Sequence, residues 1–202
     1  MAERRAALQH VSAPATGTAE PGVRLAEIAH AGKLVLRGRP EPAVIEAAAS
    51  VGLSLPTEPC TAAPTDSGTA LWLGPDEWLV VTAPGAEGAL AGALKQALAG
   101  LPAAVVDVTD SRTTIGVSGA AAREVLAKGC ALDFHPQGFA AGAVKQSRLA
   151  MVDVIIHRPA GARDGADPAF EVTVLRSFAD YLWQWLVDAA TEYGVSATGA
   201  PD

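Results

Sequence analysis

The feature that most constrains the fold of this 202-residue chain is a pattern that occurs twice along it. LVLRG at 34–38 and IGVSG at 115–119 are both short apolar segments that end at a glycine, and a helix-like segment follows each of them. At the same offset the helix-like segments align through two apolar pairs, Val44 with Val125 and Ile45 with Leu126. Either the chain holds two copies of one β-α-β-β-α unit, or the match of strand, glycine and helix is a coincidence. If the duplication is real, each copy is a ferredoxin-like split βαβ layer, a sheet with helices on one face.

Strands and helices alternate through the first half of the chain. Residues 33–38 predict a strand, and residues 41–52 predict a helix with Pro42 in its first turn and Gly52 at its end. Residues 70–81 predict a hairpin, because Leu, Trp and Val flank a GPDE linker in which proline fixes φ. A stripe of leucines then predicts a second helix; they are Leu90, Leu94, Leu98 and Leu101. Residues 103–110 predict a buried strand after it.

The second half repeats this order. Residues 112–119 predict a strand, and residues 120–128 predict a helix for which Ser118 is a candidate cap. Two strand-like runs follow, at 147–158 and 169–176. The last helix has an N-cap serine, an acidic residue three positions later as in a capping box, and a terminating glycine; these are Ser177, Asp180 and Gly194.

These patterns predict an α+β fold built from two ferredoxin-like split βαβ units. We place the first unit at residues 24–110 and the second at residues 111–202. Residues 1–23 are rich in Ala, Pro, Thr, Gly and Glu without a period, which predicts a flexible N-terminal arm. That arm is either a frayed terminus or an ordered segment that binds a partner.

Charge and composition argue against several classes of protein. The formal net charge is -7 and no basic stripe is present, which disfavours a nucleic-acid partner. No apolar run approaches the roughly 18 residues that a membrane-spanning helix needs. The first residues lack the apolar segment of a signal peptide, and two cysteines, Cys60 and Cys130, cannot make a disulfide framework. We therefore expect a cytoplasmic location.

The sequence predicts no catalytic, cofactor-binding or metal-binding residues. Among the four histidines only His135 lies near a cysteine, Cys130, and two ligands are fewer than the three or four that zinc requires. The sequence contains no GxSxG elbow, no HExxH helix, no phosphate-binding GK[ST] loop and no GxGxxG after a strand. An oxidoreductase subunit that binds its own dinucleotide usually shows the last of these motifs.

The most polar cluster between two apolar strands is DVTDSR at 107–112. As paired carboxylates, Asp107 and Asp110 have the chemistry for acid–base catalysis. The alternative is a turn in which Asp110 and Ser111 bond the local backbone and Arg112 pairs with a neighbour.

The tryptophans favour two roles. Trp72 and Trp78 face each other across the predicted hairpin, which is typical of a cross-strand aromatic pair. Trp183 and Trp185 are two positions apart on the last helix and cannot share one face. We expect at least one of them to contact another subunit, with Trp185 the weaker candidate because Tyr181 can pack beside it.

Several long segments resemble the gamma subunit of heterotetrameric sarcosine oxidase. They are LWLGPDEWLVV, DVTDSRTTIGVSGAAAREVLAKGCALDFHPQGF, KQSRLAMVDVIIHR and FEVTVLRSFADYLWQWLVDAA. The resemblance spans roughly residues 24–195 and is carried by long rather than short motifs. That family is similar in fold to the folate-binding aminomethyltransferase of the glycine cleavage system.

The resemblance implies a complex with alpha, beta and delta subunits that oxidises sarcosine to glycine and hydrogen peroxide, with tetrahydrofolate taking up the one-carbon unit. It also implies that FAD, FMN, NAD, tetrahydrofolate and zinc reside in the partner subunits, and that this chain holds no cofactor and aids assembly. The acidic motif of the folate-binding relatives has no obvious counterpart here. The alternative is a stand-alone folate-binding protein of the aminomethyltransferase type.

Overall fold

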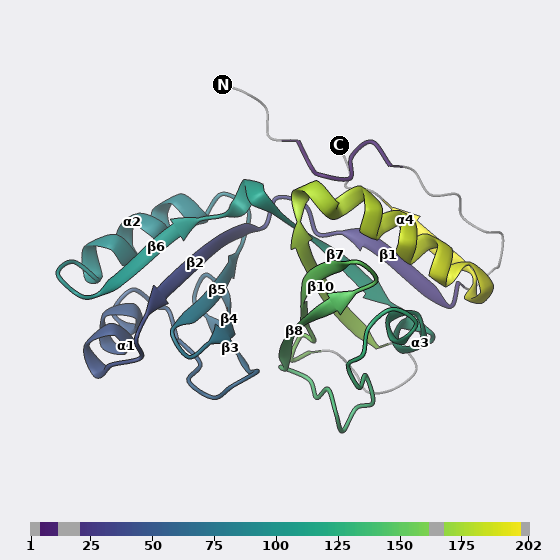
Figure 1. Cartoon of the computed structure of the whole chain (residues 1–202). Coiled ribbons are helices and arrows are strands. Elements are labelled where there is room, and N and C mark those ends of the chain that lie inside the picture. Colours follow the sequence, from purple (N-terminus) through teal and green to yellow (C-terminus); the bar gives the residue numbers. More distant parts are fainter. Residues whose placement is uncertain (1–4, 12–20, 162–167, 199–202) are drawn as a thin grey trace. The chain divides into compact units, whose positions relative to one another are not determined.

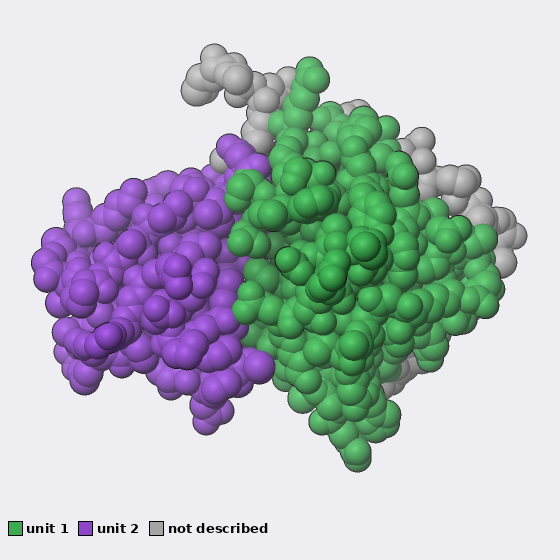
Figure 2. All heavy atoms as spheres, viewed as in Figure 1, with its two compact units in different colours: residues 1–29, 111–202 green, residues 30–110 purple. Residues whose placement is uncertain are grey.

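The computed structural model describes residues 5–11, 21–161 and 168–198. The chain divides into two compact units, shown in green and purple in Figure 2. Unit 1 comprises residues 1–29 and 111–202, and unit 2 comprises residues 30–110. Both contain a β-sheet and helices, so the fold class is α+β (Figure 1).

Unit 2 is continuous in sequence and contains a five-stranded antiparallel sheet in the order β3-β4-β5-β2-β6. Its elements in chain order are β2 (Gly32–Gly38), α1 (Pro42–Ala49), β3 (Ala62–Thr65), β4 (Gly68–Gly74), β5 (Glu77–Thr82), α2 (Glu87–Ala97) and β6 (Ala103–Asp107). The predicted helix 41–52 and hairpin 70–81 are therefore present, and Gly52 follows α1 with φ 76°, a conformation that glycine adopts freely.

The core of unit 2 lies between one face of this sheet and its two helices. Alternate residues of the strands and one stripe of each helix are buried there, as an amphipathic pattern requires. Trp78 is fully buried, and its indole Nε1 donates a hydrogen bond of 2.7 Å to the backbone oxygen of Pro56. Trp72 lies directly across the hairpin from Trp78, which confirms the predicted cross-strand pair.

Unit 1 contains a six-stranded sheet in the order β11-β1-β7-β10-β9-β8. Its elements are β1 (Val23–Glu27), β7 (Arg112–Ser118), α3 (Ala122–Ala127), β8 (Val144–Leu149), β9 (Val152–His157), β10 (Ala169–Leu175), α4 (Ala179–Ala190) and β11 (Val195–Thr198). Short 3-10 turns occupy Thr109–Ser111, Arg176–Phe178 and Thr191–Tyr193. Buried residues of α3 and α4 pack with one face of the sheet to form the core.

Both units follow one plan, β-α-β-β-β-α-β, and their strands are arranged in the same order. The series β3-β4-β5-β2-β6 of unit 2 matches the series β8-β9-β10-β7-β11 of unit 1, except that β1 lies between β7 and β11. Without the edge strands β3 and β8, and without β1 in unit 1, each unit has the strand order of a ferredoxin-like split βαβ layer. The expected fold class is therefore correct. The sequence patterns indicated four strands in the first half, where unit 2 has five, and three in the second half, where unit 1 has six.

The division of the chain differs from the consecutive one drawn from the sequence. Residues 23–27, which that division gives almost entirely to the first unit, form β1 and pair with β7 and β11 of the other unit. Strand pairing between residues 88 or more positions apart leaves no local trace in a sequence, and this is the reason for the difference.

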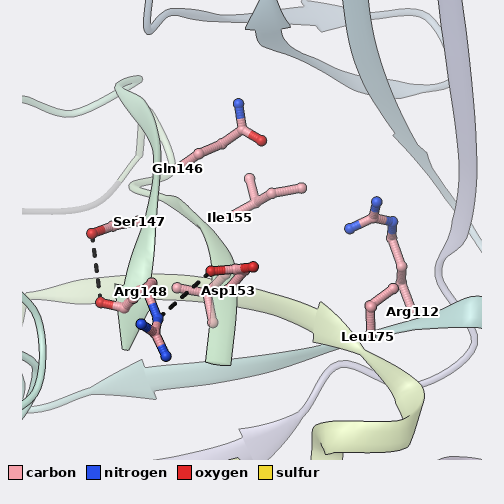
Figure 3. A pocket seen from close by; sticks show the side chains of 8 residues that line it. Arg112, Gln146, Ser147, Arg148, Asp153, Ile155 and Leu175 are labelled. Atoms are coloured by element: carbon pink, nitrogen blue, oxygen red, sulfur yellow. Dashed lines mark hydrogen bonds and ion pairs between the residues drawn. The ribbon is translucent and has the colours of Figure 1, made fainter. Parts of the chain in front are cut away.

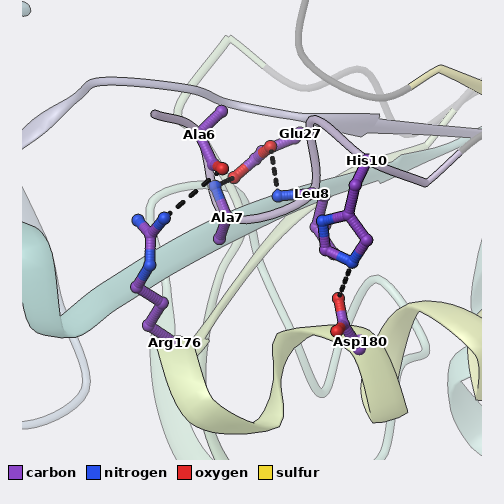
Figure 4. Close-up of polar contacts among 7 residues, drawn as sticks. All are labelled: Ala6, Ala7, Leu8, His10, Glu27, Arg176 and Asp180. Carbon is purple, nitrogen blue, oxygen red and sulfur yellow. Dashed lines mark hydrogen bonds and ion pairs between the residues drawn. The ribbon is translucent and has the colours of Figure 1, made fainter. Parts of the chain in front are cut away.

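Residues 5–11, which belong to the predicted flexible arm, pack onto unit 1 (Figure 4). Leu8 is fully buried in its core, and the backbone N–H groups of Ala7 and Leu8 donate to the carboxylate of Glu27 over 2.9 and 3.0 Å. Arg176 donates to the backbone oxygen of Arg5, and His10 lies 3.1 Å from Asp180. The rest of the predicted arm, residues 1–4 and 12–20, lies outside the described residues.

Two predicted helix caps are wrong, and one predicted strand is two. The N-cap positions of α3 and α4 are Ala121 and Phe178, without a side-chain cap bond, and not Ser118 and Ser177. The run 147–158 turns at Ala150, which has φ 53°, so that β8 and β9 form a hairpin. No helix among the described residues combines the length and the apolar character needed to cross a bilayer.

Candidate functional site

The polar cluster 107–112 forms the crossing from unit 2 into unit 1. Asp107 Oδ1 accepts a hydrogen bond of 2.9 Å from the backbone N–H of Thr109, which begins a single 3-10 turn. Thr109 Oγ1 in turn accepts the backbone N–H of Lys33 over 3.0 Å. Asp107 therefore stabilises a turn, whereas the turn interpretation of this cluster assigned the bonds to the local backbone to Asp110 and Ser111. Arg112 begins β7 and lines the pocket described below.

The structure keeps the candidate ligands Cys130 and His135 in different environments. Cys130 is buried, with its Sγ 3.5 Å from Ser147 Oγ, whereas His135 is exposed and its Nδ1 accepts the backbone N–H of Gln137. Across residues 5–11, 21–161 and 168–198, no three His, Cys, Asp or Glu side chains are grouped so that they could hold a metal ion.

The two tryptophans of α4 differ in exposure. Trp183 is 2 % exposed and belongs to the core of unit 1, so almost none of its surface is left for another subunit. Trp185 is partly buried and its ring covers Gly129, where an added Cβ would lie 2.5 Å from the ring. Tyr181, expected to pack beside Trp185, is 40 % exposed. Of the two tryptophans, Trp185 is therefore the remaining candidate for a subunit contact.

Large apolar side chains are exposed where β10 leads into α4. Leu175 at the end of β10 is 42 % exposed, and Phe178 in the following turn is 46 % exposed. Tyr181 in the first turn of α4 is exposed as well. Met151, in the turn between β8 and β9, is 71 % exposed. Sequence reasoning missed this group because it looked for tryptophans, although the LRSF segment after a strand carried the signal.

A pocket lies on the second face of the unit 1 sheet, opposite the face that packs with the helices. Figure 3 shows the side chains that line it, which come from β7, β8, β9 and β10. The lining residues are Arg112, Gln146, Ser147, Arg148, Asp153, Val154, Ile155 and Leu175, and the pocket volume is about 480 Å³. Strand alternation explains why Ile155 lies on this face, because Ile156 contributes to the core on the other face; Val154 contributes to the core and also borders the pocket.

This face of the sheet is polar and yet partly buried. Thr114 of β7 and Thr173 of β10 are directly opposite each other, and their hydroxyls lie 2.8 Å apart. His157 of β9 lies opposite Glu171 of β10, with its Nδ1 3.0 Å from Glu171 Oε2. The alternation of apolar and polar residues within 152–157 and 169–175 is the only sequence signal for such a face, and it was used only to recognise strands.

Comparison with known proteins gives one consistent answer. The family model described as "Sarcosine oxidase, gamma subunit family" matches residues 38–192. A sarcosine oxidase subunit gamma from Arthrobacter sp is 36% identical over 193 residues, which are 94% of this chain and 91% of that protein. The corresponding subunit from Corynebacterium sp. (strain U-96) is 33% identical over 96% of this chain and 93% of its own length.

Solved structures agree with the sequence comparison. A chain of the heterotetrameric sarcosine oxidase from Corynebacterium sp. U-96, solved with pyrrole 2-carboxylate, matches with a TM-score of 0.83 and 28% identity over 96% of this chain and 98% of that one. The glycine cleavage system aminomethyltransferase T from Bartonella henselae matches with a TM-score of 0.65 and 17% identity, over 88% of this chain and 48% of that one. At that identity the second likeness concerns the fold alone.

Proposed function

This chain belongs to the sarcosine oxidase gamma subunit family, and from that premise we propose that it is an accessory, non-catalytic subunit of a sarcosine oxidase complex that aids assembly. The observation that carries the proposal is the likeness over nearly the whole length of both chains, in sequence and in structure. A match of that extent leaves no large segment in which a separate activity would reside.

Two carboxylates with fixed hydrogen-bond donors support the same proposal. Asp107, one of the two carboxylates considered for acid–base catalysis, accepts a backbone hydrogen bond within a turn. Glu27 accepts three hydrogen bonds, two from the backbone of residues 7 and 8 and one from the hydroxyl of Thr113. A carboxylate with several fixed donors favours a structural role, because those bonds must be broken before it can act on a substrate.

The proposal includes the partners and cofactors that the family resemblance implies. We propose that alpha, beta and delta subunits assemble with this chain in the cytoplasm, and that FAD, FMN, NAD, tetrahydrofolate and zinc are bound by those subunits. The structural relative from Corynebacterium sp. U-96 is a chain of a heterotetrameric sarcosine oxidase, which supports the assembly part of this proposal.

We further propose that the exposed start of α4 contacts one of these partners. Phe178 and Tyr181 offer the exposed apolar surface there, and Trp185 adds the part of its ring that does not cover Gly129. Aromatic side chains of this kind are enriched at protein interfaces and often dominate their energetics. Trp183 stays with the core of unit 1.

Co-expression tests the proposal. The alpha, beta and delta subunits are produced with and without this chain, and complex yield, flavin content per alpha subunit and oxidase activity are measured. We expect the yield of assembled complex to fall sharply without this chain, and the chain purified alone to be colourless. Equal yield and activity without the chain, or a stoichiometric flavin band or tetrahydrofolate binding in the isolated chain, would contradict the accessory role.

A further inference from the structure

The pocket on the second face of the unit 1 sheet contains an arginine whose hydrogen bonding is incomplete. Arg112 Nε is buried and has no hydrogen-bond partner among the described residues. Arg112 lies at the start of β7, and its guanidinium points into the space above Ile155, toward which Gln146 extends from the other side (Figure 3). The turn interpretation of residues 107–112 expected Arg112 to pair with a neighbour.

The second arginine of the pocket is different and serves as an internal comparison. Arg148 Nη2 donates 3.1 Å to the backbone oxygen of Met151, and its Nε lies 3.9 Å from Asp153 Oδ1. Its guanidinium is therefore engaged by the β8–β9 hairpin itself. Leaving a buried guanidinium donor without an acceptor costs free energy, so an arginine placed as Arg112 is stabilised by any ligand that supplies one.

The other lining residues restrict what that acceptor can be. A planar guanidinium matches the two oxygens of a carboxylate. Asp153 places a negative charge in the same pocket, which disfavours a dianion such as phosphate. Ile155 and Leu175 form an apolar wall, and about 480 Å³ is within the range of small-molecule pockets and far larger than one ion needs. The pocket therefore suits a monocarboxylate with an apolar body.

We propose that this pocket binds a small monocarboxylate, with its carboxylate on the Arg112 guanidinium and its apolar part against Ile155 and Leu175. The site is built entirely from unit 1 of this chain. It goes beyond the accessory function proposed above and does not depend on it, because the isolated full chain already contains every lining residue.

Titration of the full chain with sodium butyrate tests the proposal, with sodium chloride at equal ionic strength as the reference. We expect butyrate to raise the melting temperature saturably, because a ligand that binds only the folded state stabilises it by mass action. Arg112→Lys keeps the positive charge but loses the planar guanidinium that can donate two parallel hydrogen bonds to a carboxylate. The butyrate concentration that gives half of the stabilisation should therefore rise roughly tenfold in this variant. Arg112→Met should lose the response, and the matched control Arg24→Met, at an exposed position of β1 outside the pocket lining, should keep it.

Saturation-transfer NMR of the butyrate protons supplies a readout that does not depend on the stability of each variant. We expect signal transfer with wild type and Arg24→Met and none with Arg112→Met. No saturable response of wild type beyond that to chloride would overturn the proposal, as would an Arg112→Met variant that responds as wild type does.

Discussion

The two units of this molecule share one strand order and differ in how the chain supplies it. Unit 2 takes all five strands and both helices from the continuous segment 30–110. Unit 1 adds β1, which comes from before that segment and lies between β7 and β11. The five strands of unit 1 that match unit 2 also follow one another along the chain, from β7 to β11, and β1 is inserted between β7 and β11 from the other end of the sequence. The comparison teaches that this strand order can accommodate an extra strand from a distant segment.

The cores differ in the same sense. The core of unit 2 is mainly aliphatic around the fully buried Trp78. That of unit 1 includes three phenylalanines in contact, with Phe170 edge-on to both Phe134 and Phe139. It also includes Leu8, which reaches it from the N-terminal segment. Stability of unit 1 should therefore depend on distant parts of the chain, and that of unit 2 should not.

The largest expected effect is in unit 2. Trp78→Ala removes a fully buried ring and its hydrogen bond to Pro56, and we expect it to lower the free energy of unfolding by about 3–5 kcal/mol. Trp72→Ala is the matched control, because Trp72 lies across the hairpin but is partly exposed, and it should cost clearly less. Urea unfolding followed by circular dichroism measures both; equal losses would mean that burial does not distinguish the two rings.

Leu8→Ala tests the dependence of unit 1 on the N-terminal segment. The leucine is fully buried, but the segment can shift, so we expect a loss of about 2–3 kcal/mol, in the lower part of the range for such truncations. Val11→Ala, at a partly exposed position of the same segment, should cost less. Unchanged unfolding of the Leu8 variant would show that residues 5–11 are not part of the unit 1 core.

Glu27→Gln tests the polar contacts of the same segment. The Glu27 carboxylate accepts hydrogen bonds from Ala7 N, Leu8 N and Thr113 Oγ1 at 2.9, 3.0 and 2.7 Å. Glutamine keeps the size but replaces one acceptor oxygen with a donor, which should cost about 1–2 kcal/mol. Because Glu27 and Leu8 act on one segment, the double variant should lose less than the sum of the two single losses. Additive losses would show that the two contacts are independent.

The smallest effect is expected at the surface of unit 1. Asp180 lies 3.1 Å from His10, but the side chains are 54 % and 62 % exposed, so solvent screens the pair. Asp180→Asn should change the free energy of unfolding by less than about 0.5 kcal/mol. A loss as large as that of Glu27→Gln would mean that the ion pair, and not the buried contacts, holds the N-terminal segment.

The elements that sequence patterns predicted are those set by local periodicity. Residues 33–38, 41–52 and 70–81 carry complete signals in neighbouring residues, and the fold class follows from their order. The edge strand β3 was missed because Pro64 and its neighbours indicate a loop; proline is tolerated at an edge because its missing N–H is not needed there. The turn at Ala150 was missed because it has neither glycine nor asparagine.

The candidate site was less predictable than the fold. Arg112 stood out in a polar cluster, but its surroundings come from β8, β9 and β10, which are 34 or more positions away in sequence. The lack of a hydrogen-bond acceptor for the buried Nε of Arg112 depends on those surroundings, and no local sequence pattern indicates it. Likewise, helical spacing showed that Trp183 and Trp185 face different ways, but only packing decides that Trp183 faces the core.

The parallel pairing of β1 with β11 has a consequence for synthesis on the ribosome. Val23 pairs with Val195, so the sheet of unit 1 stays incomplete until almost the whole chain has been translated. Unit 2 has all its strands once residue 110 has left the exit tunnel, and domains generally fold as they emerge. During elongation unit 2 can therefore fold first, while β1 still lacks both of its partner strands, β7 and β11.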